Sequence, residues 1–265
     1  MPIVIDEPPS VLGRAAARLA AILLAAASAG CASPPPLVPD HAWIVVTTGA
    51  PERASLERAG FLIAPTVNRH DGQGTASITV EFVNSFLELT WPDPSVPVSP
   101  ALQAGAEKFR LKSRWRETGY SPLGIVFART PETPAVMPFP TWRIVADWME
   151  PGTSIEMLTP KERPRALSLS ISSHLETTRE TNEALARDPA TRAMFLHPNG
   201  TRRLTRLRVT APAAEALPPA ASFVAAPGLM EFEVGGEWLL EVTLDEGVQG
   251  LAVDFRPELP LAIRY

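Results

Sequence analysis

The alternation of apolar and polar positions predicts that strands dominate the first part of the chain. Residues 75–83 alternate as a half-buried strand does, while 40–48 and 85–91 form strands that end at polar or proline residues. Residues 50–60 have the pattern of a helix, with Pro51 in its first turn and Gly60 at its C-terminal end. A strand at 61–67 and a polar turn at 68–74 complete the predicted order β-α-β-β-β.

Beyond residue 98 the pattern predicts a polar helix and a second set of strands. The helix covers 99–118, and another lies within 174–195, where Pro189 breaks or ends it. Strands are predicted at 123–128, 141–148, 154–158, 166–172, 204–210, 230–234, 237–243 and 250–255. Residues 85–90 weakly resemble 237–243, and in each segment a glutamate, Glu88 or Glu241, lies between apolar residues of the predicted strand. This similarity suggests a second, divergent copy of the first unit.

The N-terminus is typical of a secretory signal. Two arginines precede the apolar run 19–27, which is too short to span a membrane comfortably, and small residues follow it. Ala29-Gly30-Cys31 matches the end of bacterial lipoprotein signals, whereas Ser28 departs from that pattern. We therefore expect a signal at 1–30, a lipid anchor at Cys31 and a proline-rich tether at 31–39. The alternative is an ordinary signal cleaved after 27–29, which would give a periplasmic protein.

Composition narrows the function only broadly. The chain has 265 residues, 24 Lys and Arg against 29 Asp and Glu, and a net charge of −5. This balance argues against general binding of nucleic acid, which requires a basic surface. A single cysteine excludes an intrachain disulfide and a cysteine-rich zinc site. Neither a nucleophile elbow nor a glycine-rich dinucleotide fingerprint is present.

Several short motifs in order resemble the glyoxalase-like domains of the vicinal oxygen chelate superfamily. They are Asp40-His41, Gly60-Phe61, 70–75 and 86–89. The resemblance implies an α+β fold in which paired β-α-β-β-β modules form a curled mixed sheet. On this basis, 40–118 is the first module with its linking helix, and 119–265 contains the second.

The same resemblance implies a divalent metal on the concave face of the sheet, held by the first and last strands of each module. The corresponding ligands are His41, Glu88 and, through the internal similarity, Glu241, for zinc, nickel, iron or manganese. The two glutamates are then also the candidate catalytic residues. The fourth ligand position falls near residues 204–205, which offer no good ligand. Trp91, Arg143 and His197 are the candidate contacts of a small-molecule ligand or substrate.

Two functions from different classes fit these expectations. One is a metal-dependent lyase, isomerase or dioxygenase acting on a small oxygen-rich substrate. The other is a binding protein that uses the same cup without chemistry, which the missing fourth ligand favours. Each candidate ligand also has an interpretation without a functional role: residue 41 would be a half-buried histidine of a strand, and residue 88 a glutamate that faces solvent. By the sorting rule of lipoproteins, the expected location is the cell envelope, at the outer membrane facing the periplasm.

Overall fold

The computed structural model describes residues 34–172 and 178–265, and strands dominate both ranges. The first half contains β1 (Leu37–Val45), α2 (Arg53–Arg58), β2 (Asn68–His70), β3 (Thr75–Phe82), β4 (Ser85–Pro92), α3 (Gln103–Lys112), α4 (Trp115–Thr118) and β5 (Leu123–Arg129). There follow β6 (Trp142–Ile144), β7 (Ile155–Met157), β8 (Ser168–Ile171), α5 (Thr178–Arg187), β9 (Leu204–Ala211), α6 (Ala221–Val224), β10 (Met230–Val234), β11 (Leu239–Leu244), β12 (Ala252–Asp254) and β13 (Leu261–Arg264). The remaining helical segments are single 3-10 turns.

The first eight strands form one mixed sheet in the order β2-β3-β4-β1-β5-β8-β7-β6. β1 runs parallel to β4, β5 runs parallel to β8, and antiparallel pairing of β1 with β5 joins the two halves. The order β1-β4-β3-β2 is thus repeated as β5-β8-β7-β6, which confirms the paired modules. The second module has no crossover helix: residues 130–141, which connect β5 to β6, contain only turns and bends.

The last five strands form a separate sheet in the order β10-β9-β11-β13-β12. β11, which contains the segment that the internal similarity assigned to the second module, lies beside β9 in this sheet. The structural counterpart of β1 to β4 is therefore β5 to β8, and the similarity between 85–90 and 237–243 is not a structural repeat. Short apolar strands resemble one another whichever sheet they enter, so a match of this length cannot identify a module.

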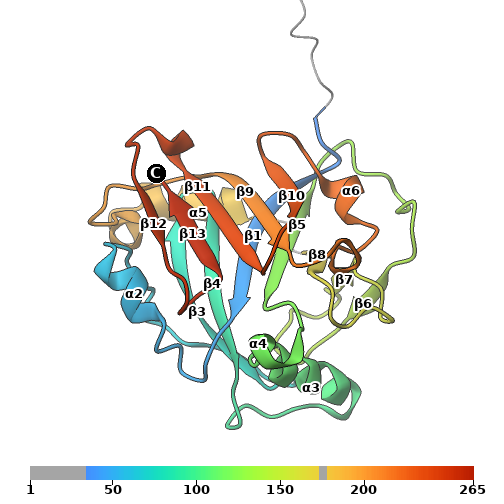
Figure 1. Ribbon diagram of the computed structural model, residues 1–265. Helices are drawn as coiled ribbons and strands as arrows, with labels where there is room; N and C mark the ends of the chain where they lie inside the picture. The colour runs from blue at the N-terminus through green and yellow to red at the C-terminus, as the bar shows by residue number, and fades with distance from the viewer. Residues whose placement is uncertain (1–33, 173–177) are drawn as a thin grey trace, which may run out of the picture. The chain divides into compact units, whose positions relative to one another are not determined.

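One hydrophobic core lies between the two sheets. Alternate residues of the eight-stranded sheet, such as Ile44, Leu89 and Ile125, belong to the same buried cluster as Val209 and Leu240 of the five-stranded sheet. In Figure 1 the strands β9, β11 and β13 lie in front of β1, β3 and β4, as expected for two packed layers. The opposite face of the eight-stranded sheet is left free to carry polar side chains.

Some predicted elements differ from those observed. Residues 61–67 are not a strand, because Phe61 enters the core and the amide of Leu62 bonds the His197 ring, while strand pairing starts only at Asn68. The predicted helix at 99–118 is divided between α3 and α4. β1 begins at Leu37, within the predicted tether, and β13 was not predicted.

Contacts between the two edges show that the eight-stranded sheet is curled. β2 and β6 lie at opposite edges. The segment after β6 nevertheless reaches the β2–β3 turn: the Trp148 ring lies 5.1 Å from the His70 ring, and Trp148 Nε1 donates to Gln73 Oε1 at 3.3 Å. The sheet therefore has the shape of a half-barrel, with the polar face on its concave side. Among the described residues, no helix is long and apolar enough to cross a membrane.

Candidate binding site on the concave face

Strand alternation and register place a set of polar and aromatic side chains on the concave face. On β1, Ala42 and Ile44 are in the core, so His41 and Trp43 point the other way. The same reasoning applies to β3 and β4, whose core residues alternate with polar or aromatic ones. One row across the sheet contains Glu81, Phe86, His41, Val126 and Ser170, and the next contains Thr79, Glu88, Trp43, Gly124 and Ser168.

Glu88 lies near the middle of this face, beside His70. Its Oε1 is 3.8 Å from His70 Nε2, and both side chains are 15% exposed. The other ring nitrogen of His70, Nδ1, is 2.9 Å from Thr75 Oγ1. Glu88 therefore remains reachable from solvent, and the nearest basic group is an imidazole rather than a lysine or arginine.

Asp40 orients His41. Asp40 Oδ2 is 2.7 Å from His41 Nδ1 and 2.6 Å from Thr178 Oγ1, while Oδ1 accepts the Thr178 amide at 3.0 Å. Burial alone would raise the pKa of Asp40, but these hydrogen bonds and the charge of His41 hold that pKa below its ordinary value. The ionised carboxylate accepts Nδ1–H, so a neutral His41 ring leaves Nε2 as an acceptor. This ring stacks on Phe86 at 4.0 Å.

Glu81 is the second carboxylate on this face. Its Oε2 accepts a hydrogen bond from Asn182 of α5 at 3.0 Å. Burial raises the pKa of Glu81, and the negative charge of Glu88 adds to the rise, while hydrogen bonds from Thr79 and Asn182 and the charge of His41 oppose it. Glu88 is thus close enough to contribute to the raised pKa of Glu81.

A buried lysine lies beside Trp43 at the other end of this face. Lys112, at the end of α3, is 5% exposed; its Nζ donates to Ser121 O at 2.8 Å and lies 5.6 Å from the Trp43 ring centroid. Burial, with a smaller contribution from Lys108, lowers the pKa of Lys112 to about 7. Gly124 makes room for the Trp43 ring, because a Cβ at this position would lie 2.0 Å from Trp43 Cε2.

These side chains do not suit a divalent metal held by both modules. The concave positions of β5 and β8 are Gly124, Val126, Ala128, Ser168 and Ser170, which include no carboxylate or imidazole. Within 34–172 and 178–265, no three His, Cys, Asp or Glu side chains are grouped as metal ligands. A protein site for zinc, nickel, iron or manganese commonly needs at least three such donors. The predicted ligand set does not fit the structure.

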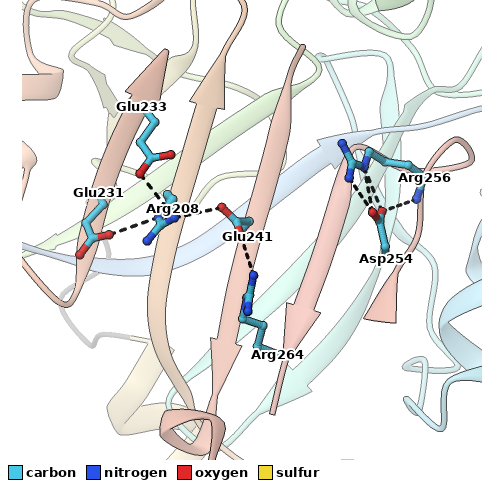
Figure 2. Close-up of polar contacts among 7 residues, drawn as sticks. All are labelled: Arg208, Glu231, Glu233, Glu241, Asp254, Arg256 and Arg264. Atoms are coloured by element: carbon cyan, nitrogen blue, oxygen red, sulfur yellow. Dashed lines mark hydrogen bonds and ion pairs between the residues drawn. The ribbon is translucent and has the colours of Figure 1, made fainter. Parts of the chain in front are cut away.

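Glu241 lies far from the predicted ligand set in the fold. It is on β11 of the five-stranded sheet, where Leu240 and Val242 enter the core and Glu241 faces outward. Figure 2 shows it between Arg208 and Arg264, and each of its oxygens is 3.6 Å from a guanidinium nitrogen. The metal and catalytic roles predicted for Glu241 alongside His41 and Glu88 are therefore not supported by its position.

The three predicted substrate contacts do not come together either. Trp91 is 4% exposed and packs in the core, on the face of β4 opposite Glu88. Arg143 is exposed and lies on the opposite side of β6 from Trp142, whose partner Met157 pairs with Ser170. Both positions follow from strand alternation, which sends neighbouring residues to opposite faces.

His197 is buried and serves as a bridge between two segments. Its Nδ1 accepts the Leu62 amide at 3.0 Å, so Nε2–H donates to Glu81 O at 2.9 Å. The ring packs against Phe61 and Phe82, and burial lowers its pKa. Both ring nitrogens are occupied by backbone groups, which indicates a structural role. The predicted lipidation site, Cys31, lies outside the described residues.

The predicted set of site residues did not include Asp40, Trp43, His70, Glu81 or Trp148, all of which contribute to this face. Part of the signal was present, because Glu81 falls on the polar positions of an alternating strand and Asp40 adjoins His41. The participation of Trp148 depends on the curl, which no local pattern shows. A shallow cleft of about 360 Å³ elsewhere is lined by Pro51, Glu52, Arg116, Pro257 and Glu258, and includes none of the predicted site residues.

Comparison with known families agrees with this architecture. A model of the glyoxalase-like domain matches residues 40–222, which include both modules and β9. The chain belongs to the glyoxalase-like domain family. The match supports the curled mixed sheet and the small-molecule site that such domains commonly have, while β10 to β13 lie beyond it. No curated protein matches the chain. A crystal structure described as a hypothetical protein from Staphylococcus aureus aligns with a TM-score of 0.45 and 10% identity, over 86% of this chain and 99% of that one.

Proposed function

We propose that this glyoxalase-like protein binds a small polar molecule on the concave face of its eight-stranded sheet, without a metal ion. The observation that carries this proposal is the position of Glu88, partly exposed at the middle of that face with His70 at 3.8 Å. His41 and Glu81 occupy the next row, so four titratable side chains surround one region. Polar groups converging among aromatic rings are typical of ligand sites.

The argument against a metal-dependent function is the distribution of ligands. Within residues 34–172 and 178–265, the carboxylate and imidazole side chains of the concave face come from the first module, whereas the second module presents small or apolar side chains. The resemblance calls for ligands from both modules. A binding role requires only hydrogen bonds, charge and shape, and the first module supplies these by itself.

The test is a ligand screen by thermal unfolding and calorimetry, performed with a chelator present. Binding raises the unfolding temperature by mass action. We expect a ligand that stabilises the wild type and a Glu233→Gln control but not Glu88→Gln. Glu233 is an exposed glutamate of the other sheet, so the control removes one charge without touching the concave face. A ligand that binds only when a divalent metal is added, or equally well to Glu88→Gln, would overturn the proposal.

A second candidate is metal-free proton transfer at His41. The 2.7 Å contact with an ionised Asp40 fixes the ring and leaves Nε2 as a proton acceptor, an arrangement used by general bases. The test is exchange of the α-hydrogen of small carbonyl compounds in heavy water. His41→Gln and Asp40→Asn should both slow the exchange, and the pH profile of Asp40→Asn should shift. Exchange at the buffer rate with the wild type would rule this function out.

We also propose that the protein is exported and anchored through a lipid at Cys31. The support is the signal pattern of the sequence alone. The full chain and a Cys31→Ser variant, expressed in bacteria with a labelled fatty acid, should differ in label and in recovery with the membrane fraction. Equal recovery of both in the membrane fraction, with no label in either, would refute the anchor.

A further inference from the structure

Two carboxylates of the concave face, Glu81 and Glu88, have no lysine or arginine partner among the described residues. Glu88 faces only the imidazole of His70, at 3.8 Å. Glu81 receives hydrogen bonds from the neutral Asn182 and Thr79 side chains. Lys112, the nearest buried cation, bonds the Ser121 carbonyl and forms no ion pair with either glutamate. Two partly buried carboxylates thus lack a lysine or arginine partner in the part of the chain that the structure describes, and the repulsion that Glu88 exerts on Glu81 would favour a cationic ligand between them.

Aromatic rings flank both carboxylates. Phe86 is the cross-strand partner of Glu81, and Trp43 is that of Glu88. Trp148 covers His70 from the opposite edge of the sheet, with ring centroids 5.1 Å apart. A cation is attracted to the face of an aromatic ring, and the combination of carboxylates with rings is suited to an ammonium group.

The Ser77 hydroxyl is a second, independent sign of a ligand. Ser77 is fully buried, and its Oγ has no hydrogen-bond partner. It lies on the concave face of β3, two residues before Thr79, the partner of Glu88. Neighbouring Thr75 and Thr90 on this face do have partners, His70 and the Ala76 carbonyl. A buried hydroxyl without a partner destabilises the free protein, so Ser77 is suited to a polar group that arrives with the ligand.

The second module supplies the apolar half of the face. Val126 and Ala128 of β5 point to this side and are nearly buried, and Met157 and Trp142 extend the same row. The concave face is therefore divided: the carboxylates lie on β3 and β4, whereas the second module presents mainly apolar side chains, interrupted only by the Ser168 and Ser170 hydroxyls of β8 among the described residues. A ligand that matches both halves has a polar end and an apolar body.

We infer that the ligand of this face is an organic cation, with an ammonium group toward Glu81 and Glu88 and an apolar body toward Val126. The inference rests on the proposed binding function and deepens it by assigning a chemical class. It follows from three features that meet in one curled sheet: two carboxylates without a lysine or arginine partner among the described residues, aromatic rings beside them, and a buried hydroxyl without a hydrogen-bond partner.

The experiment uses matched probes that differ only in charge. Calorimetry of the full chain, with a chelator at low salt, compares the affinities for 2-phenylethylamine, 2-phenylethanol and 3-phenylpropanoate. Two further sets carry the same amine, alcohol and carboxylate end groups on a naphthyl or a hexyl group in place of the phenyl ring. We expect at least one amine to bind tenfold or more tightly than its alcohol and carboxylate. Glu88→Gln and Glu81→Gln should each lower the affinity for that amine at least fivefold, and Glu233→Gln should leave the affinity unchanged.

Ser77→Ala provides a readout that a purely structural role would not give. Removing a buried, unpaired hydroxyl should leave the unfolding temperature of the free protein equal or higher, while amine affinity falls about threefold or more. If Ser77 only packs, affinity will not change.

The possible failures can be told apart. If alcohols or carboxylates bind as tightly as the amines, and Glu88→Gln leaves amine binding intact, the assignment of a cation is overturned while the binding function stands. If no probe binds and the wider screen also finds no ligand, both proposals fail. Amine binding that is equal in the wild type and both glutamine variants would place the cation elsewhere and refute the inference.

Discussion

The buried ammonium of Lys112 should make the stability of the protein depend on pH, and Lys112→Met should remove that dependence. The side chain is 5% exposed, and among the described residues its Nζ donates a hydrogen bond only to the Ser121 carbonyl. Burial lowers its pKa from 10.5 to about 7. Methionine has nearly the same length and volume and no charge, so the substitution preserves packing against Trp43.

The sign of this pH dependence follows from the linkage between protonation and folding. Between the folded pKa near 7 and the unfolded value of 10.5, the unfolded state binds more protons, so stability rises with pH. The free energy of unfolding increases by at most about 1.4 kcal/mol per pH unit through this group. Integrated from pH 6 to pH 9, the increase is about 2–3 kcal/mol. Methionine leaves the Ser121 carbonyl without its lysine donor, which costs about 1 kcal/mol. The variant should therefore be more stable than the wild type at pH 6.

Urea unfolding from pH 6 to pH 9 tests this directly. Subtracting the variant from the wild type cancels the contributions of other titrating groups. Lys161→Met is the matched control, because Lys161 also lies over a tryptophan, 4.8 Å from the Trp142 ring, but is exposed. It should follow the pH dependence of the wild type. A Lys112→Met curve parallel to that of the wild type, or less stable at pH 6, would refute the reasoning.

Four further substitutions test the packing and the surface charges. Gly124→Ala should destabilise by about 1–3 kcal/mol in urea, because its Cβ meets the Trp43 ring, whereas Gly105→Ala, in an open helical position, should stabilise by up to about 1 kcal/mol. His197→Ala should cost about 2–5 kcal/mol at pH 8. That loss should shrink in acid, since burial lowers the pKa of His197 and its contribution disappears as it protonates. Glu241→Gln should change stability by less than about 1 kcal/mol, a difference that salt reduces.

The periodicity of the chain was enough to predict much of the secondary structure. Strict alternation in 75–83 predicted both the strand and its two faces, because the pleat repeats every two residues. Pro51 and Gly60 marked the limits of the α2 region, because proline and glycine act through local backbone geometry. These local effects, together with the short motifs of the first module, were enough to predict the glyoxalase-like fold.

Contacts between segments that are far apart in the sequence could not be predicted from periodicity. Glu88 and Glu241 have nearly the same apolar neighbours, yet one lies on the concave face beside His70 and the other between two arginines. Likewise, Trp91 belongs to the buried cluster that both sheets share, and His197 is buried because its ring bonds the Leu62 amide and the Glu81 carbonyl.

The sequence by itself thus determined which residues form strands and which side of each strand is apolar, since these depend on neighbours along the chain. Only the tertiary structure decided which strands share a sheet and which polar side chains meet. The pairing of Trp148 with His70 shows why: it joins opposite edges of the sheet, so it depends on the accumulated curl of eight strands. A candidate site made by that curl is a property of the whole sheet, and no single segment encodes it.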